Sequence, residues 1–169
     1  MPTREPRVQL PVPFVRQHHE TCAPATLTAL AQYWKKAIKH EEVVERICYE
    51  GTQASDERRW AEENGFFARE FRITHESADA LIRAGVPFTF NTVEPTSAHL
   101  QAIVGIDDFR GTFLIQDPSE RHIGEGSIDK LLERYASTGP RSKATFQLRA
   151  SVTVMQFVFV WIMRRRLQR

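Results

Sequence analysis

Cys22 lies where a cysteine side chain can act as a nucleophile, at the expected start of a helix. Thr21 is a suitable helix cap, and Pro24 suits the first helical turn, where its missing N–H leaves no hydrogen bond unmade. Free amides and the helix dipole at such a position stabilise a thiolate over a thiol. Gln17, earlier in the same segment, can offer its side-chain amide to a developing oxyanion. The alternative interpretation is a small buried cysteine beside a loop glutamine.

His99 is the histidine best placed to serve as a base for such a thiol. A thiol nucleophile needs a base within hydrogen-bonding distance, and the base needs a group that orients it. His99 begins the most apolar expected strand of the chain, residues 98–106. The remaining histidines lie beside Cys22 in one loop, or in polar turns and at helix edges where a solvated ring is the simpler interpretation: His18, His19, His40, His75 and His122.

Asp117 is expected to lie beside His99 through the geometry of a hairpin. The strand over residues 98–106 folds back on residues 112–116 about the turn-forming residues 107–111. This brings His99 and Asp117 to the same end of the ladder, where opposing residues are about 5 Å apart. A carboxylate there can fix the tautomer of the imidazole. The alternative is an ordinary Asp-Pro turn.

The first third of the chain is predicted to be mainly helical. A short strand over residues 12–15 leads to the helix of Cys22. Residues 40–50 carry apolar side chains at helical spacing, which places Cys48 on the buried face of a short helix. Cys48 is therefore interpreted as a structural cysteine. A third short helix is expected over residues 55–64.

The pattern then changes to strands. The expected elements are a strand over 66–73, a helix over 77–83, a strand over 86–93, the hairpin described above and a helix over 127–135. The first strand of the hairpin is almost continuously apolar, which indicates burial on both faces. Helices followed by antiparallel strands indicate an α+β fold, with N-terminal helices packed on an antiparallel sheet.

The composition is that of an ordinary globular domain. The chain has 169 residues, enough for one domain with a substantial core. Its formal net charge is +2, and arginines at the C-terminus supply more than this excess. The rest of the chain is therefore close to neutral, which argues against a nucleic-acid partner.

Cofactor and metal sites are not expected. The two cysteines are too few for a disulfide scaffold or for a cysteine-based zinc site. No other cluster has metal-ligand spacing, and Gly124-Glu125-Gly126 is too short to indicate a phosphate-binding loop. The N-terminal residues are charged and interrupted by prolines, without an apolar signal core, so we expect a cytoplasmic, reducing environment.

The chain is divided into an irregular lead-in over residues 1–11, a domain over residues 12–148 and an extension over residues 149–169. Residues 152–163 are apolar and β-prone, and a basic segment follows them. This run is shorter than the roughly 20 residues that a transmembrane helix needs. We expect a final sheet strand. The alternatives are a membrane-anchoring segment with its basic flank on the cytoplasmic side, or a poorly specified extension.

Three motifs together resemble a known bacterial peptidase family. They are Gln17 and Cys22 in VPFVRQHHETCAPATLTALAQYW, His99 in SAHLQAIVGIDD, and Asp117 in GTFLIQDPS. They are similar to the bacteriocin-processing domains of double-glycine-leader exporters, and more closely to stand-alone peptidase C39-like domains, some of which precede tetratricopeptide repeats. The resemblance covers roughly residues 10–140.

The resemblance implies a papain-like cysteine peptidase that needs no cofactor and acts on a peptide or protein substrate. It implies Cys22 as nucleophile, His99 as base, Asp117 as the orienting group and Gln17 as oxyanion donor. The chain departs from the family in Ala23, where glycine is usual after the cysteine, and in its late apolar run. The alternatives are therefore a catalytically silent peptide-binding module and a thiol acyltransferase with the same residues. The sequence does not indicate an oligomeric state.

Overall fold

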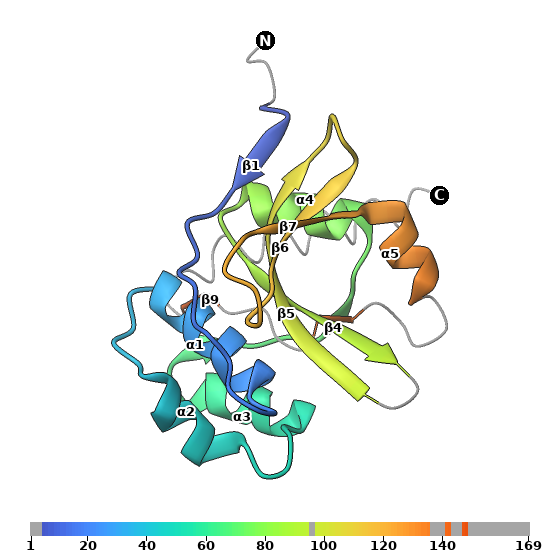
Figure 1. Cartoon of the computed structure of the whole chain (residues 1–169). Helices are drawn as coiled ribbons and strands as arrows, with labels where there is room; N and C mark the ends of the chain where they lie inside the picture. Colours follow the sequence, from blue (N-terminus) through green and yellow to red (C-terminus); the bar gives the residue numbers. More distant parts are fainter. Residues whose placement is uncertain (1–4, 95–96, 136–140, 143–146, 149–169) are drawn as a thin grey trace.

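The computed structural model describes residues 5–94, 97–135, 141–142 and 147–148 (Figure 1). In chain order, its elements are β1 (Arg7–Gln9), α1 (Cys22–Tyr33), α2 (His40–Ile47), α3 (Ala54–Glu63), β2 (Phe66–Phe67), β3 (Phe71–Arg72), α4 (His75–Arg83), β4 (Phe88–Glu94), β5 (Ser97–Asp107), β6 (Thr112–Gln116), β7 (Gly124–Ser127), α5 (Ile128–Arg134), β8 (Arg141–Ser142) and β9 (Gln147–Leu148). The expected α+β fold class is confirmed.

Strand β5 is the centre of an antiparallel sheet with the order β3-β8-β4-β5-β6-β7. On one side β5 pairs with β4 from Ser97 to Ile103, and β1 continues that side from Gly105 to Asp107. On the other side it pairs with β6, but only from Ala102 onward. The amino-terminal part of β5 therefore has a strand neighbour on one side only.

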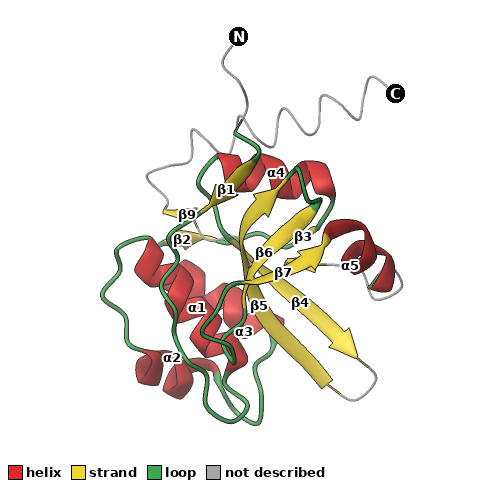
Figure 2. Ribbon diagram, turned by 45° about the horizontal axis from the view of Figure 1, so that its top comes forward, coloured by secondary structure: helices red, strands yellow, loops and turns green. Residues whose placement is uncertain are grey.

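Two hydrophobic clusters lie on opposite faces of β5. Leu100, Ala102 and Val104 belong to the cluster of α1, α2 and α3, whereas Ile103 and Ile106 belong to the cluster of α4 and α5. The first three helices form one group beside the sheet, and α4 and α5 lie apart from that group (Figures 1 and 2). Burial of β5 on both faces, expected from its apolar run, is confirmed.

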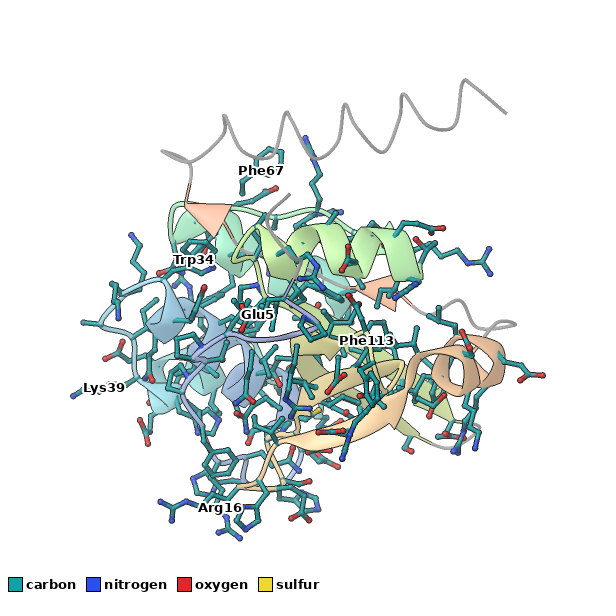
Figure 3. All side chains as sticks on the ribbon, turned by 90° about the horizontal axis from the view of Figure 1, so that it is seen from above. Glu5, Arg16, Trp34, Lys39, Phe67 and Phe113 are labelled. Atoms are coloured by element: carbon teal, nitrogen blue, oxygen red, sulfur yellow. The ribbon has the colours of Figure 1, made fainter. Side chains whose placement is uncertain are left out.

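Helix α1 is the most deeply buried helix of the N-terminal group. Every residue from Ala23 to Ala31 is buried. Its side chains are small or aliphatic through this stretch, and the hydroxyls of Thr26 and Thr28 form hydrogen bonds inside the protein, so this part of the helix presents no polar face to solvent. By contrast, Arg16 and Lys39 project outward at the edge of the molecule, while Phe113 lies in the interior (Figure 3).

Two expectations at the N-terminus are wrong. The segment expected to be an irregular lead-in, residues 1–11, contains β1, which pairs with β5. Residues 12–15, expected to be a strand, have no regular secondary structure. Prolines explain both differences. Pro6 and Pro11 flank β1 without interrupting it, whereas Pro11 and Pro13 remove amide donors that a strand over residues 12–15 would need.

Cys48 does not lie on the buried face of a helix, which corrects the expectation for this residue. Helix α2 ends at Ile47, and Cys48 follows it with an extended backbone. Its side chain is only half-buried, and its Sγ lies 3.6 Å from the backbone oxygen of Glu20. The helical period stops one residue too early to bury Cys48, which instead contacts the loop that precedes Cys22.

Other differences concern short elements. The expected strand over residues 66–73 is divided into β2 and β3, which belong to different sheets. The glycine-rich strand β7 was not expected, because Gly124 and Gly126 have low strand propensity. Helix α4 is capped by Thr74 in a capping box with Ser77, so it begins before the expected position. The extension over residues 149–169 lies outside the described residues.

Gly105 lies on β5 between its two strand neighbours β1 and β6, where we expect that no side chain fits. A Cβ atom there would lie 2.4 Å from the backbone oxygen of Val8 and 2.6 Å from Cδ1 of Leu114. We expect Gly105→Ala to lower the free energy of unfolding by about 1–3 kcal/mol, because backbone and core must shift. Urea denaturation measures this change. Gly124→Ala is the matched control, since its nearest contact is at 3.8 Å; equal effects of the two substitutions would contradict the steric argument.

Candidate active site

Cys22 is the first residue of α1, as the sequence predicts, and its side chain is half-buried. Thr21 is the residue before the helix, but its hydroxyl makes no capping bond to the helix. It instead accepts a 2.8 Å hydrogen bond from the backbone N–H of His18. The expected capping role of the Thr21 side chain is therefore corrected: its hydroxyl closes the loop before Cys22. The thiol is left at the open end of the helix, where the first backbone amides have no partner within the helix.

His99 and Asp117 meet across the end of the hairpin. Nε2 of His99 lies 3.0 Å from each carboxylate oxygen of Asp117. The pairing of β5 with β6 ends at Ala102 and Gln116, so His99 and Asp117 both lie just beyond the last paired residues. The expected placement of the two side chains at one end of the ladder is confirmed. Their side chains are 30% and 24% exposed, so the pair is partly shielded from water.

The ring of His99 also forms a hydrogen bond with the side chain of Cys22. Because Nε2 is occupied by Asp117, Nδ1 is the ring nitrogen that remains for the thiol. The hydrogen bond to Asp117 is the largest cause that raises the pKa of His99 from 6.5 to about 9, and the hydrogen bond with Cys22 adds to it. The imidazole is therefore held as the imidazolium at neutral pH.

The thiol of Cys22 responds in the opposite direction. Burial raises the pKa of Cys22, but hydrogen bonds with His99 and with the backbone of Leu100 and Ala23, together with the charge of His99, lower it below its ordinary value. A lowered thiol pKa beside a raised histidine pKa favours the thiolate–imidazolium pair. Hydrogen bonds thus connect the side chains of Cys22, His99 and Asp117.

Asp117 is held in place by the turn that follows it. Its Oδ1 accepts hydrogen bonds from the backbone N–H of Ser119 at 2.8 Å and from the Ser119 hydroxyl at 2.6 Å. Burial raises the pKa of Asp117, but the hydrogen bonds from His99 and Ser119 lower it to about 2. The carboxylate therefore stays ionised and keeps the ring of His99 oriented. Ser119 was not expected at the site, although Asp, Pro and Ser are all residues that favour such a turn.

Gln17 is tied to the same turn by its backbone. Its N–H donates a 2.9 Å hydrogen bond to the carbonyl of Pro118, the residue after Asp117. Its side chain is half-buried, and Oε1 is buried with no hydrogen-bond partner among the described residues. The structure thus joins the segment before Cys22 to the segment that carries Asp117. The role of the Gln17 amide as an oxyanion donor stays a prediction.

His40 is buried, although the sequence suggested a solvated ring. It is 8% exposed, and it stacks on His18 with ring centroids 5.6 Å apart. Burial, followed by the charge of His18, lowers the pKa of His40. It therefore packs as a neutral ring against the loop before Cys22, at the start of α2. The adjacent residues Lys39 and Glu41 are both exposed, so the side chain of His40 is buried because of the face of α2 on which it lies.

The described residues contain neither a cluster of metal-ligating side chains nor a helix that could span a membrane. Within residues 5–94, 97–135, 141–142 and 147–148, no three His, Cys, Asp or Glu side chains are grouped as metal ligands would be. In the same part of the chain, no helix combines the length and the apolar character needed to cross a membrane.

Residues 9–143 match the model of a family described as the Peptidase_C39 like family. No curated protein matches the chain significantly. The peptidase domain of Streptococcus ComA, a bifunctional ABC transporter involved in quorum sensing, is similar in structure, with a TM-score of 0.66, 18% identity, and coverage of 82% of this chain and 99% of that domain.

Two further solved structures share the fold. One is a double glycine motif protease from an AMS/PCAT transporter in complex with the leader peptide, with a TM-score of 0.61, 16% identity, and coverage of 83% of this chain and 95% of that one. The other is the peptidase domain of Streptococcus mutans ComA, with a TM-score of 0.51, 20% identity, and coverage of 79% of this chain and 96% of that one. These similarities confirm the papain-like fold that the sequence resemblance implied.

We expect Asp117→Asn to lower the pKa of His99, because the hydrogen bond to the Asp117 carboxylate is the largest cause of its raised value. NMR titration of the His99 ring should show an inflection near pH 9 in the wild-type protein and one at least about one pH unit lower in the variant. Asp129→Asn, an exposed carboxylate on α5, serves as control and should leave the His99 inflection unchanged. Equal inflections in wild type and Asp117→Asn would contradict the assignment of Asp117.

Proposed function

Because the chain belongs to the peptidase C39-like family, we propose that it is an active papain-like cysteine peptidase or closely related acyl hydrolase. In this proposal Cys22 is the nucleophile, His99 the general acid and base, Asp117 the orienting group and Gln17 an oxyanion donor. The observation that supports it most strongly is the continuous set of hydrogen bonds from Cys22 through His99 to Asp117. The three residues come from α1, β5 and the segment after β6.

The first step is attack of the Cys22 thiolate on the carbonyl carbon of a peptide bond. The new C–S bond forms as the π electrons of the carbonyl move to its oxygen. The backbone N–H of Cys22, at the open start of α1, can donate to this oxyanion. The side-chain amide of Gln17 supplies the second donor in our proposal. The backbone of both residues is held in place before the reaction, because the N–H of Gln17 is bonded to the carbonyl of Pro118 and Cys22 begins a buried helix.

Breakdown of the tetrahedral intermediate releases the amine product. The C–N bond breaks, and the leaving nitrogen takes the proton from Nδ1 of His99. The acyl group remains on Cys22 as a thioester. Neutral His99 then accepts a proton from water, whose oxygen attacks the thioester carbonyl. The C–S bond breaks, the carboxylic acid leaves, and the thiolate–imidazolium pair is restored. Asp117 keeps its charge throughout and holds Nε2.

The substrate class in this proposal is a peptide. One structural relative is a double glycine motif protease that was solved with a leader peptide. A peptide with Gly-Gly before the cleaved bond is therefore a suitable first probe for this chain. A thiol acyltransferase would use the same first step and then pass the acyl group to an acceptor other than water.

The substitution of alanine for the usual glycine at position 23 does not disturb the start of α1. Ala23 is 4% exposed, lies within the helix and belongs to the core cluster that α1 shares with β5. Its Cβ is therefore accommodated by packing. This observation supports an active site over a silent peptide-binding module, for which Ala23 was the main argument.

We expect Cys22→Ala to lower cleavage of a fluorogenic Gly-Gly peptide amide by about a thousandfold or more, because no other thiol is paired with His99. In the wild-type protein, iodoacetamide at pH 7 should alkylate Cys22 faster than Cys48, as quantified by peptide mass spectrometry. Cys48→Ala is the matched control and should keep most of the cleavage. Faster alkylation of Cys48, or equal cleavage by Cys22→Ala and wild type, would overturn the proposal.

Gln17 offers a second test, because alkylation and hydrolysis make different demands on the site. Displacement of iodide by the thiolate produces no oxyanion, whereas attack on a peptide carbonyl does. We therefore expect Gln17→Ala to slow cleavage by about a hundred- to a thousandfold while the rate of Cys22 alkylation changes by less than about twofold. Gln17→Met, which keeps the length of the side chain without the amide donor and adds no charge, should behave similarly. A parallel loss of both reactions would instead assign Gln17 to the structure of the loop.

A further inference from the structure

Leu100 is the point at which α1 and β5 are joined beside the site. Its backbone carbonyl accepts a 3.0 Å hydrogen bond from the hydroxyl of Thr26, in a buried environment and across 74 residues of sequence. Its backbone also hydrogen-bonds to the side chain of Cys22. Because a thiolate can only accept, the N–H of Leu100 is the donor in that contact. Both polar groups of one peptide residue are thus bonded to side chains of α1.

The place of Leu100 in the sheet explains why its backbone is available. Pairing of β5 with β6 begins at Ala102, so Leu100 lies beyond the end of β6. Cys22 and Thr26 are one helical turn apart and therefore lie on the same face of α1. Helix α1 thus takes the place that a strand would occupy beside this part of β5. His99, the residue before Leu100, is carried on the same short stretch of backbone.

We propose that Thr26 is a positioning residue for the thiol chemistry of Cys22. Its hydroxyl holds the His99–Leu100 segment at the distance at which the Leu100 N–H and the His99 ring both face Sγ of Cys22. Thr26 does not touch the reacting atoms, and it acts through the backbone of Leu100. This inference rests on the proposed function, since it concerns how the nucleophile and its base are held together.

Thr26 differs in its hydrogen bonding from Thr28, a threonine whose hydroxyl bonds only within the helix. Thr26 and Thr28 are 3% and 0% exposed, and both belong to α1. The Thr28 hydroxyl donates to the carbonyl of Pro24, within the same helix, at 2.7 Å. The Thr26 hydroxyl donates to β5. Replacing either threonine by valine removes one buried hydroxyl and keeps the branched shape, but only Thr26→Val releases Leu100.

The test is the pH dependence of Cys22 alkylation by iodoacetamide, followed by peptide mass spectrometry in the full chain. Wild type should show an inflection below the ordinary thiol value of about 8.5. We expect Thr26→Val to shift this inflection upward by about one pH unit, so that alkylation near pH 6 slows by about tenfold, as expected when one hydrogen-bonded contact to the thiolate is weakened. Thr28→Val should leave the inflection in place.

Thr26→Ser keeps the hydroxyl and should restore the wild-type inflection to within about 0.3 pH unit. If a circular dichroism spectrum shows that Thr26→Val does not fold, Thr26→Ala and Thr28→Ala give the same comparison: an inflection shifted only by Thr26→Ala supports the role of Thr26, and equal inflections overturn it. An inflection shifted equally by Thr26→Val and Thr28→Val, or not shifted by Thr26→Val, would overturn the role of Thr26 while leaving the proposed function intact. An ordinary thiol inflection in the wild-type protein would overturn the proposed function and, with it, this inference.

Discussion

The first turn of α1 packs against the part of β5 that has no β6 neighbour, and every other feature of the site depends on this contact. It places Cys22 beside His99 and satisfies both backbone groups of Leu100 with side chains of one helix. The contact is stable because α1 is buried from Ala23 to Ala31 and shares a core cluster with β5. A strand that continued β6 along β5 would leave no room for the nucleophile. The early end of β6 is therefore what opens the sheet for the helix.

The electrostatics of the site follow from the order of its three groups. Asp117 lies on one side of the imidazole and Cys22 on the other, so the ring gains a partner at each nitrogen. The pKa of His99 is raised from 6.5 to about 9 in the folded protein. Protonation of its ring therefore stabilises the fold, fully below pH 6.5, and this stabilisation is lost as the pH rises through 9. The pKa of Asp117 is lowered from 3.8 to about 2. Ionisation of this carboxylate therefore stabilises the fold above pH 3.8, and this stabilisation is lost as the pH falls through 2. Both contributions to stability are therefore fully present from about pH 4 to pH 6.5, and the contribution of His99 declines above that range.

The parts of the site that obey local rules could be predicted from the sequence. A helix start marked by Thr21 and Pro24 located Cys22, and a hairpin between two apolar runs placed His99 beside Asp117. Strong apolar periodicity likewise gave β5, β6 and α4. By contrast, β1 depends on a long-range pairing of Arg7–Gln9 with β5, and β7 has two glycines in four residues. The burial of His40, the position of Cys48 and the bond from Thr26 to Leu100 are tertiary contacts between distant segments, which no local pattern records.

Whether the site performs acyl transfer is tested most directly by the covalent intermediate itself. Mixing the protein with an excess of a p-nitrophenyl ester of an acylated Gly-Gly dipeptide and measuring nitrophenol release on the millisecond scale reports acylation of the thiol. The account predicts a burst of about one equivalent per chain, with the acyl mass found on the peptide that contains Cys22. A folded protein that shows no burst and no acylated Cys22 would contradict the account, and would leave a papain-like domain that binds peptides without cleaving them.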